Sequence, residues 1–374
     1  MKNNSMEYTC LFGGGAVRGM AYVGAVKALE ELGIYPVNVG GSSVGSAVAA
    51  LMAVGYDATD IKELFLDVNF DLFRDIQFNL GPKFALSKGE VFLNWIRELI
   101  ESKYYGENYE KGKNRSVTFK DIEKNLTIIT TDISNFKCQE FSKKATPDFE
   151  IATAVRISCG LPGLMKPYEY NNTLLVDGDL QKSMPMWQLS ENILNDRERV
   201  IEFRLEGQYA GDDKNAIDYV NTVYSCITSI CTDFISSMYG KRDKFDYITI
   251  NTGNVIVVDF NCPREKREQL IKEGYEQTIH YFREILPSKK EKLLDTYYSI
   301  DKSIRHVQKL ISAQNILKAK QDFCELFVEL CEAGYTIDSV MYSFVPNKTE
   351  FIKAISFLTC QLYATSSNIV HTTS

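Results

Sequence analysis

The strongest constraint on the fold is a unit of strand, glycine-rich turn and helix that occurs twice in the first 55 residues. Tyr8 to Phe12 is a short apolar run followed by three glycines, and a helical pattern then covers Arg18 to Leu32. Val37 to Gly40 is a second strand candidate, followed at once by a helical pattern from Val44 to Val54. Strands that alternate with helices at this spacing predict an α/β fold with a mostly parallel central sheet.

Later β-rich runs are expected to extend this sheet, whereas the region after Pro287 changes character. The segment from Asp57 to Gly112 is helical and polar in pattern, with little strand character. Helical periodicity dominates after residue 288, so we expect an α/β domain over 8–287 and an α-helical C-terminal extension over 288–374. The further strands expected are 126–131, 137–141, 174–176, 200–205, 247–252, 255–260 and, in the extension, 340–345, and further helices are expected at 150–158, 216–238 and 269–286.

The composition excludes several classes of protein. The chain has 374 residues, 45% of them hydrophobic, which is ample for a large buried core. The formal net charge of −7 gives no reason to expect nucleic acid as a partner. Nine scattered cysteines without a C-x-x-C pair are typical of reduced thiols in a cytosolic chain.

Neither end of the chain nor its interior carries a recognisable membrane signal. The first seven residues are polar and lead straight into a strand, so we expect no secretory signal peptide. No run approaches 18 apolar residues, so we expect no transmembrane helix. These features predict a cytoplasmic protein whose contact with membranes, if any, is peripheral.

Gly41-Ser42-Ser43-Val44-Gly45 is a G-x-S-x-G pentapeptide that lies between the second expected strand and the following helix. A nucleophilic serine in this motif occupies a sharp, strained turn, and small flanking residues let strand and helix approach each other. The N-terminus of the helix also offers free N–H groups and a partial positive charge to a developing oxyanion. The motif therefore predicts Ser43 as the nucleophile of a serine hydrolase, with Gly41, Val44 and Gly45 forming the turn.

The glycines from Gly13 to Gly15, followed by Ala16-Val17-Arg18-Gly19, form a second constellation. A dinucleotide-binding loop would need G-x-G-x-x-G, and this spacing puts Ala16 where the second glycine belongs. Such a site also needs an acidic residue after the second strand, where this chain has Gly-Ser-Ser. An oxyanion hole is favoured over a nucleotide site, because the nucleophile turn follows the adjacent strand. We expect no cofactor and no metal.

A serine hydroxyl needs a base to accept its proton. The three histidines, His280, His306 and His371, all lie late in the chain, the first two in expected helices and the third in the tail. Asp177, in the sequence Val-Asp-Gly-Asp at the end of an expected strand, is better placed to reach a turn at the same sheet edge. The alternative for Asp177-Gly178 is a plain hairpin turn, and both interpretations remain open at this point.

Three blocks in this order resemble the bacterial patatin-like phospholipases. The similarity extends from about Tyr8 to about Arg283. It implies a three-layer α/β/α fold with a mostly parallel central sheet, and lipid acyl hydrolase activity. The blocks are Gly14–Gly19 with the helix end VKALEELGI, then Gly41–Gly45, and then AVRISCGLPGLMKP at 154–167 with Leu175–Gly178.

The resemblance assigns roles residue by residue. Ser43 matches the nucleophile and Asp177 the catalytic aspartate, a dyad without histidine. Ala16 replaces a third glycine and keeps its N–H donor, provided that its φ suits a Cβ. Asp179 stands where the family usually has glycine or alanine, and we expect its side chain to face solvent. Pointed inward, it could raise the pKa of Asp177. The oxyanion loop of the family corresponds to Gly14, Gly15, Ala16, Arg18 and Gly19.

The implied reaction is two-step acyl transfer by a phospholipase A-type or lysophospholipase enzyme. Its substrate would be a membrane phospholipid or lysolipid. One alternative is an α/β-hydrolase that uses Ser43, an aspartate and His280, although only two strands precede its serine. The other is a catalytically silent scaffold that acts through residues 288–374, which could bind a regulatory partner, form a homo-oligomer or gate the site.

Overall fold

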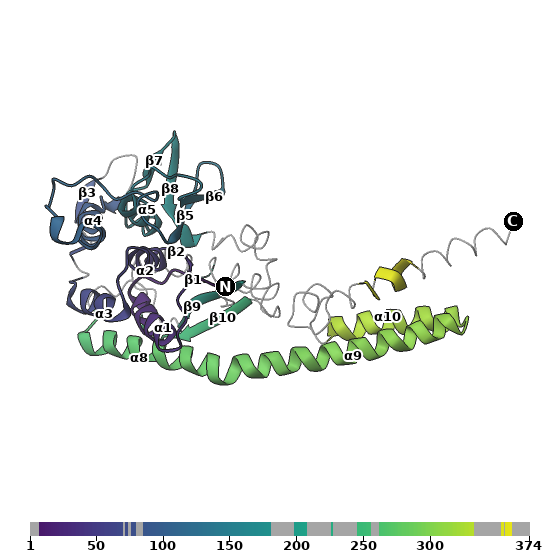
Figure 1. Ribbon diagram of the computed structural model, residues 1–374. Coiled ribbons are helices and arrows are strands. Elements are labelled where there is room, and N and C mark those ends of the chain that lie inside the picture. Colours follow the sequence, from purple (N-terminus) through teal and green to yellow (C-terminus); the bar gives the residue numbers. More distant parts are fainter. Residues whose placement is uncertain are drawn as a thin grey trace. The chain divides into compact units, whose positions relative to one another are not determined.

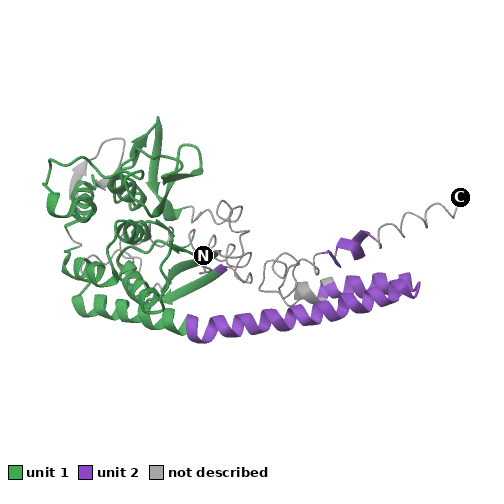
Figure 2. Ribbon diagram, in the orientation of Figure 1, with its two compact units in different colours: residues 1–236, 246–281 green, residues 237–245, 282–374 purple. Residues whose placement is uncertain are grey.

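The computed structural model describes residues 7–69, 72–73, 76–79, 85–180, 198–207, 226, 245–255, 262–332, 353–354 and 356–360. The chain divides into two compact units (Figure 2). Unit 1 comprises 1–236 and 246–281, and unit 2 comprises 237–245 and 282–374. The expected division between 287 and 288 stays a prediction.

A mixed sheet forms the centre of unit 1 (Figure 1). Its strands lie in the order β10-β9-β1-β2-β5-β8-β7, with β6 paired to β5. The three successive pairs β9–β1, β1–β2 and β2–β5 are parallel, which confirms the expected mostly parallel sheet. The strands are β1 (Glu7–Phe12), β2 (Asn38–Ser42), β5 (Asn125–Asp132), β6 (Lys137–Ser142), β7 (Tyr168–Tyr170), β8 (Thr173–Asp177), β9 (Glu198–Glu206) and β10 (Phe245–Asn251).

Strand β5 carries two strands end to end along one of its edges. β6 pairs with 127–132 of β5 and occupies one edge. On the other edge, parallel β2 pairs with 125–129 and antiparallel β8 pairs with 130–132. Ser42, the last residue of β2, is opposite Ile129, and Asp177, the last residue of β8, is opposite Thr130. The two strands therefore meet head to head where β2 ends.

The helices of unit 1 begin and end where the local sequence requires. Helix α1 is followed by Gly33, which adopts a left-handed φ of 70°. Asp57 caps α3 by accepting a hydrogen bond from the Asp60 amide at 2.8 Å. The helices are η1 (Ala16–Gly19), α1 (Met20–Glu31), α2 (Val44–Ala53), α3 (Ala58–Asp67), α4 (Glu90–Tyr105), η3 (Gly106–Asn108), α5 (Ile151–Ser158), η4 (Gly178–Leu180) and α8 (Arg264–His280).

One region of unit 1 differs from its sequence pattern. The stretch between Asp57 and Gly112 was expected to hold little strand, yet β3 (Ile76–Asn79) and β4 (Ala85–Ser87) form a small antiparallel pair outside the main sheet. Three-residue and four-residue strands are too short for an alternating pattern to stand out against the flanking helices.

The core of unit 1 is aromatic at the sheet and very closely packed between two helices. Phe12 stacks on Phe203 at 5.2 Å between ring centroids and meets Tyr22 edge-on at 5.3 Å. Helices α1 and α8 touch through glycines, since a Cβ on Gly24 would lie 1.8 Å from a backbone oxygen of α8. Gly274 lies equally close to α1, so α8 is an integral part of this unit.

Unit 2 contains helices α9 (Leu286–Ser312) and α10 (Ile316–Glu332), which pack on each other. The helical character expected for this region is confirmed for the part that the structure describes. Phe323 and Leu326 of α10 are buried, whereas Leu317 of the same helix is 84% exposed. The cluster that α9 and α10 share comprises Tyr297, Ile300, Ile304, Val307, Ala319, Phe323, Leu326 and Leu358.

Several expectations lie outside the described residues, namely the helix at 216–238 except for residue 226, the strand at 340–345, most of the strand at 255–260, and His371. Within the described part of the chain, no helix is both long enough and apolar enough to cross a lipid bilayer.

Candidate active site

Ser43 lies at the junction of β2 and α2 in a conformation that few residues adopt. Its φ of 49° and ψ of −133° are costly for a residue with a Cβ, and such strain is concentrated at functional turns. The flanking glycines explain how the turn closes. A Cβ on Gly45 would lie 2.1 Å from the Phe12 oxygen, and one on Gly41 would lie 2.3 Å from the backbone of Gly45. The small residues of the pentapeptide are therefore required by packing.

Ser43 and Asp177, which come from different strands, are directly hydrogen-bonded. The Ser43 hydroxyl donates to Asp177 Oδ2 at 2.8 Å, and both side chains are buried. Asp177 Oδ1 accepts a hydrogen bond from the Asp179 amide, also at 2.8 Å. The head-to-head arrangement of β2 and β8 on β5 brings the two side chains together, although they are 134 residues apart in sequence.

Helix α5 contacts the Ser43 turn through Ser158. The Ser158 hydroxyl accepts a hydrogen bond from the Ser43 amide at 2.9 Å and donates to the Ile129 carbonyl at 2.6 Å. Ser158 thus connects the Ser43 backbone to β5. Ser158 was not predicted as a site residue from the sequence, although it lies in the third block that carries the family resemblance.

The glycine-rich loop runs beside Ser43 with unusual backbone angles. Gly15 has a φ of 148° and Ala16 a φ of 45°, so Ala16 adopts a left-handed conformation that costs an L-residue roughly 1–2 kcal/mol. The Gly13 amide donates to the Phe203 carbonyl. Within the described part of the chain, the amides of Gly15 and Ala16 donate to no acceptor. Both amides are therefore available to a ligand.

Arg18 and Gly19 hold the end of this loop. Arg18 is buried and donates from Nε to the Val255 carbonyl at 2.7 Å. Burial lowers the pKa of the Arg18 guanidinium. Gly19 lies against Val44, because a Cβ at this position would be 2.4 Å from Val44 Cγ2. The loop is therefore fixed both to the residues after β10 and to the first turn of α2.

The side chain of Asp179 lies inside the protein, so the expectation that it faces solvent was wrong. It is 6% exposed, and its Oδ1 accepts from the Gly14 amide at 3.1 Å and from the Ser42 hydroxyl at 3.3 Å. The reason is the direction of β8, which ends against β2 and continues into the short helix η4 below the glycine-rich loop. A single-sequence pattern does not reveal that strand direction.

An apolar cavity of about 80 Å³ opens beside Ser43. Four large aromatic side chains of α3, α4 and the segment between them contribute to it, and Phe73 is in edge-on contact with Phe92 at 5.2 Å. These aromatic residues were not predicted from the sequence, because the segment that contains them is polar overall. Burial raises the pKa of the Cys159 thiol that faces the same cavity. The other apolar lining residues are Ala16, Val17, Met20, Val44, Ala47, Phe65, Trp95, Leu161, Leu164 and Met165.

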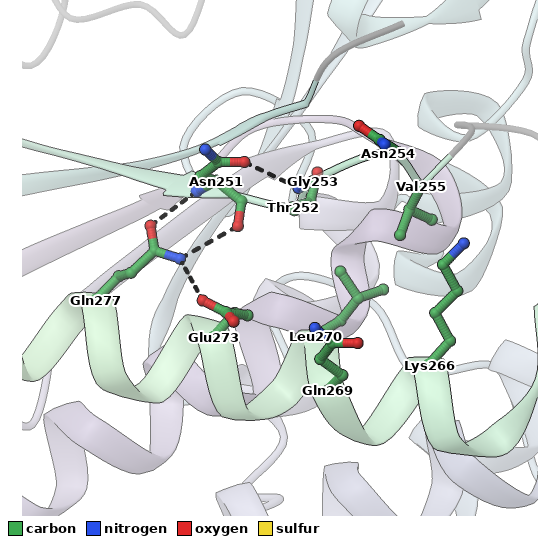
Figure 3. A pocket seen from close by; sticks show the side chains of 10 residues that line it. All are labelled: Asn251, Thr252, Gly253, Asn254, Val255, Lys266, Gln269, Leu270, Glu273 and Gln277. Carbon is green, nitrogen blue, oxygen red and sulfur yellow. Dashed lines mark hydrogen bonds between the residues drawn. The ribbon is translucent and has the colours of Figure 1, made fainter. Parts of the chain in front are cut away.

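A second cavity, of about 540 Å³, is polar and lies between the turn after β10 and helix α8 (Figure 3). Gln277 joins the two sides, accepting from the Asn251 amide at 2.8 Å and donating to its carbonyl at 3.1 Å. Gln277 also donates to Glu273 at 3.0 Å. Val255 lines this cavity as well as accepting from Arg18, so the cavity borders the anchor of the glycine-rich loop.

Neither of the two described histidines, His280 and His306, has a described hydrogen bond to Ser43. His280 is exposed at the end of α8, and no described interaction joins it to Ser43 or Asp177. His306 of unit 2 pairs with Asp322 at 3.1 Å. The structure therefore brings Ser43 together with an aspartate, and no described histidine is hydrogen-bonded to either residue.

Part of unit 1 is similar to a known protein family. Residues 11–189 match the model of the family described as patatin-like phospholipase. The uncharacterized protein R571 of Acanthamoeba polyphaga mimivirus is 29% identical over 277 residues, covering 70% of this chain and 89% of that protein. The "Probable lipid hydrolase 463L" of Invertebrate iridescent virus 6 is 29% identical over 190 residues, covering 48% of this chain and 61% of that protein.

A solved structure extends the comparison to the fold. The crystal structure of VipD from Legionella pneumophila superposes with a TM-score of 0.56 at 17% identity, covering 98% of this chain and 86% of that one. At this level of identity the likeness concerns the fold alone. The chain thus has a patatin-like α/β fold, with a mostly parallel mixed sheet and a C-terminal helical region.

Proposed function

We propose that this chain is a lipid acyl hydrolase that cleaves fatty-acyl esters through an acyl-serine intermediate, with Ser43 as nucleophile and Asp177 as base. The observation that carries the proposal is the 2.8 Å hydrogen bond from the Ser43 hydroxyl to Asp177 Oδ2 at a strained strand-to-helix turn. A nucleophile and a base within hydrogen-bond reach are the minimum for this chemistry.

In the first step, Asp177 accepts the Ser43 proton as Oγ bonds to the ester carbonyl carbon. The tetrahedral intermediate then collapses, the bond to the alcohol oxygen breaks, and that oxygen takes the proton from Asp177. In the second step, a water gives its proton to Asp177 and attacks the acyl-serine. The fatty acid leaves, and Ser43 recovers its proton.

The oxyanion of each intermediate would be stabilised by the amides of Gly15 and Ala16, which donate to no acceptor in the described structure. The amide of Val44, at the N-terminus of α2, is a further candidate donor. One such donor contributes about 10²- to 10³-fold to the rate in serine hydrolases. Gly14 is not in this set, because its amide already donates to Asp179.

The apolar cavity supports a fatty-acyl chain as the group bound next to Ser43. The name of the iridescent-virus relative, a lipid hydrolase, supports the same substrate class. We assign the activity as phospholipase A-type or lysophospholipase, acting on a membrane phospholipid or lysolipid through peripheral contact with the bilayer.

Substitution of the nucleophile is the direct test. Ser43→Ala is expected to lower p-nitrophenyl ester hydrolysis at least about 10³-fold without changing the unfolding temperature, because only the attacking oxygen is removed. Ser102→Ala, on helix α4, is a matched control that should retain full activity. Full activity of Ser43→Ala would refute the assignment.

Two further outcomes address the alternatives. A fluorophosphonate probe should label Ser43 of the wild type, and absence of the label would favour a catalytically silent scaffold. His280→Ala should leave activity unchanged, since His280 is exposed and has no described contact with Ser43. A loss comparable to that of Ser43→Ala would instead favour a triad with histidine.

A further inference from the structure

We propose that Asp179 is a positioning residue that ties the glycine-rich loop to the nucleophile turn, and that it withdraws the Gly14 amide from the donors available to the oxyanion. This inference rests on the proposed function of Ser43 and Asp177. Its basis is that one oxygen, Asp179 Oδ1, accepts from both the Gly14 amide at 3.1 Å and the Ser42 hydroxyl at 3.3 Å.

Residue 179 touches three parts of the site through different atoms. Its side chain contacts the loop at Gly14 and the nucleophile turn at Ser42, whereas its backbone amide donates to Asp177 Oδ1. The amide contact leaves Asp177 Oδ2 to accept from Ser43. Almost any residue at 179 would keep the backbone amide that donates to Asp177. A side-chain substitution therefore removes the contacts to Gly14 and Ser42 while the hydrogen bond to Asp177 stays.

The packing at Gly14 shows that the loop is built around this carboxylate. A Cβ on Gly14 would lie 2.6 Å from Asp179 Cγ and 2.7 Å from Oδ2. The φ of Gly14 is outside the left-handed region, so its backbone conformation alone does not demand glycine. The side chain of Asp179 is what excludes a larger residue at position 14.

The consequence for catalysis follows from the neighbouring backbone. Gly15 and Ala16, whose amides are the proposed donors, both have positive φ and directly follow the tied residue. Donors that are held in place before the reaction stabilise the oxyanion without reorganisation. Loosening the tie should therefore lower kcat more than it changes KM, because the charge develops only in the transition state.

The Asp179 carboxylate has no described hydrogen bond to the side chain of Ser43 or Asp177. Asp179 is not among the residues that line the apolar cavity, and its Oδ1 is directed at an N–H and an O–H donor. Its contribution is that of an acceptor, which a neutral amide oxygen can replace. Asparagine at 179 is thus the conservative variant expected to rescue the function that glycine loses.

The first experiment compares Asp179→Gly and Asp179→Asn with the wild type on a soluble p-nitrophenyl ester. We expect Asp179→Gly to lower kcat roughly 10-fold or more with KM within about 2-fold, and Asp179→Asn to retain kcat within about 3-fold. The affinity for a trifluoromethyl ketone, which mimics the tetrahedral intermediate, should fall in parallel with kcat/KM in the glycine variant.

Asp132→Ala is a matched control. Asp132 is also a buried carboxylate that accepts from backbone amides, those of Ser134 and Asn135 at 3.0 Å, but it belongs to the β5–β6 turn and touches neither Ser43 nor the glycine-rich loop. Its loss should lower the unfolding temperature and leave kcat unchanged. A merely structural Asp179 would behave in the same way.

A second experiment uses the close contact at Gly14. Gly14→Ala alone should be more damaging than Asp179→Gly, because the new Cβ overlaps the carboxylate. In the double variant the overlap is gone, so kcat should return to the level of Asp179→Gly alone. Such a return of kcat would show that residues 14 and 179 are in contact. Losses of kcat that simply add in the double variant would refute this contact.

Three results would overturn the proposal, namely an unchanged kcat in Asp179→Gly, a rise in KM at constant kcat, or an asparagine variant as impaired as the glycine variant. If Asp179→Gly does not fold, Ser42→Ala, which removes one of the two bonds to Oδ1, must still lower kcat at constant KM. Fluorophosphonate labelling of wild-type Ser43 tests the proposed function separately. If the probe labels Ser43 and Asp179→Gly leaves kcat unchanged, the inference about Asp179 is refuted and the proposed function is not.

Discussion

The Ser43 turn of unit 1 and the helical pair of unit 2 depend on their sequences in opposite ways. At the turn, one added atom is enough to disrupt the packing, since a Cβ on Gly41 or Gly45 would lie 2.1–2.3 Å from backbone atoms. In α9 and α10 the cohesion comes from apolar side chains at helical spacing, where the periodic pattern matters more than any one residue. The first region is therefore recognisable as a motif, and the second only as an amphipathic pattern.

The largest effect is expected from adding a methyl group at the turn. Gly45→Ala should destabilise unit 1 by more than about 3 kcal/mol and abolish ester hydrolysis, because backbone atoms of Phe12 and Gly13 cannot move away cheaply. The measurement is a urea unfolding curve followed by circular dichroism. Gly33→Ala is the control, since nothing lies within 4 Å of its Cβ position and only its φ of 70° opposes the change. Equal effects at both positions would contradict the importance of packing at the turn.

An intermediate effect is expected from a cavity in the helical pair. Ile304 is 1% exposed within the cluster shared by α9 and α10, and Ile304→Ala should cost about 2–5 kcal/mol in the unfolding of unit 2. Hydrolysis of a soluble ester should be unaffected. Leu317→Ala, on the same helical pair but 84% exposed, should change the unfolding free energy by no more than about 0.5 kcal/mol. A loss of activity in Ile304→Ala would show that the two regions are coupled.

The smallest effect is expected from a polar contact of the same pair. Hydrogen bonding to Lys318, together with the contact to His306, lowers the pKa of Asp322 below its usual range. A lowered pKa in the folded state gives stability that is present above about pH 4, the unfolded value, and is lost as the pH falls through the folded value. Asp322→Asn should therefore lower the unfolding temperature slightly at pH 7 and progressively less below about pH 4. A larger effect than that of Ile304→Ala would show that polar contacts dominate this pair.

Much of the fold could be predicted from sequence because its signals are local. Two repeats of strand, glycine turn and helix lead to the mostly parallel sheet, and β2 and α2 begin within one residue of their expected positions. The short β3 and β4 were missed because three or four residues carry no usable periodicity.

The candidate site was predictable to the extent that motifs encode it. Ser43 and Asp177 were both singled out from sequence, and the structure places their side chains in contact. The roles of Ser158 and Asp179 were not predictable, because they depend on the antiparallel direction of β8 and on the packing of α5. The aromatic residues of the cavity were hidden in a segment whose average character is polar.

The end-to-end meeting of β2 and β8 makes the spacing of Ser43 and Asp177 a property of alignment along a single strand. Both strands take their position from consecutive residues of β5, so a shift of β8 by one residue would displace Asp177 by about 3.3 Å and turn its side chain to the opposite face. Insertions at 171–172, in the turn before β8, can be absorbed without such a shift, whereas a deletion within 174–176 cannot. In the course of evolution, the turns beside this site are thus free to change length, whereas β2, β5 and β8 must keep their number of residues.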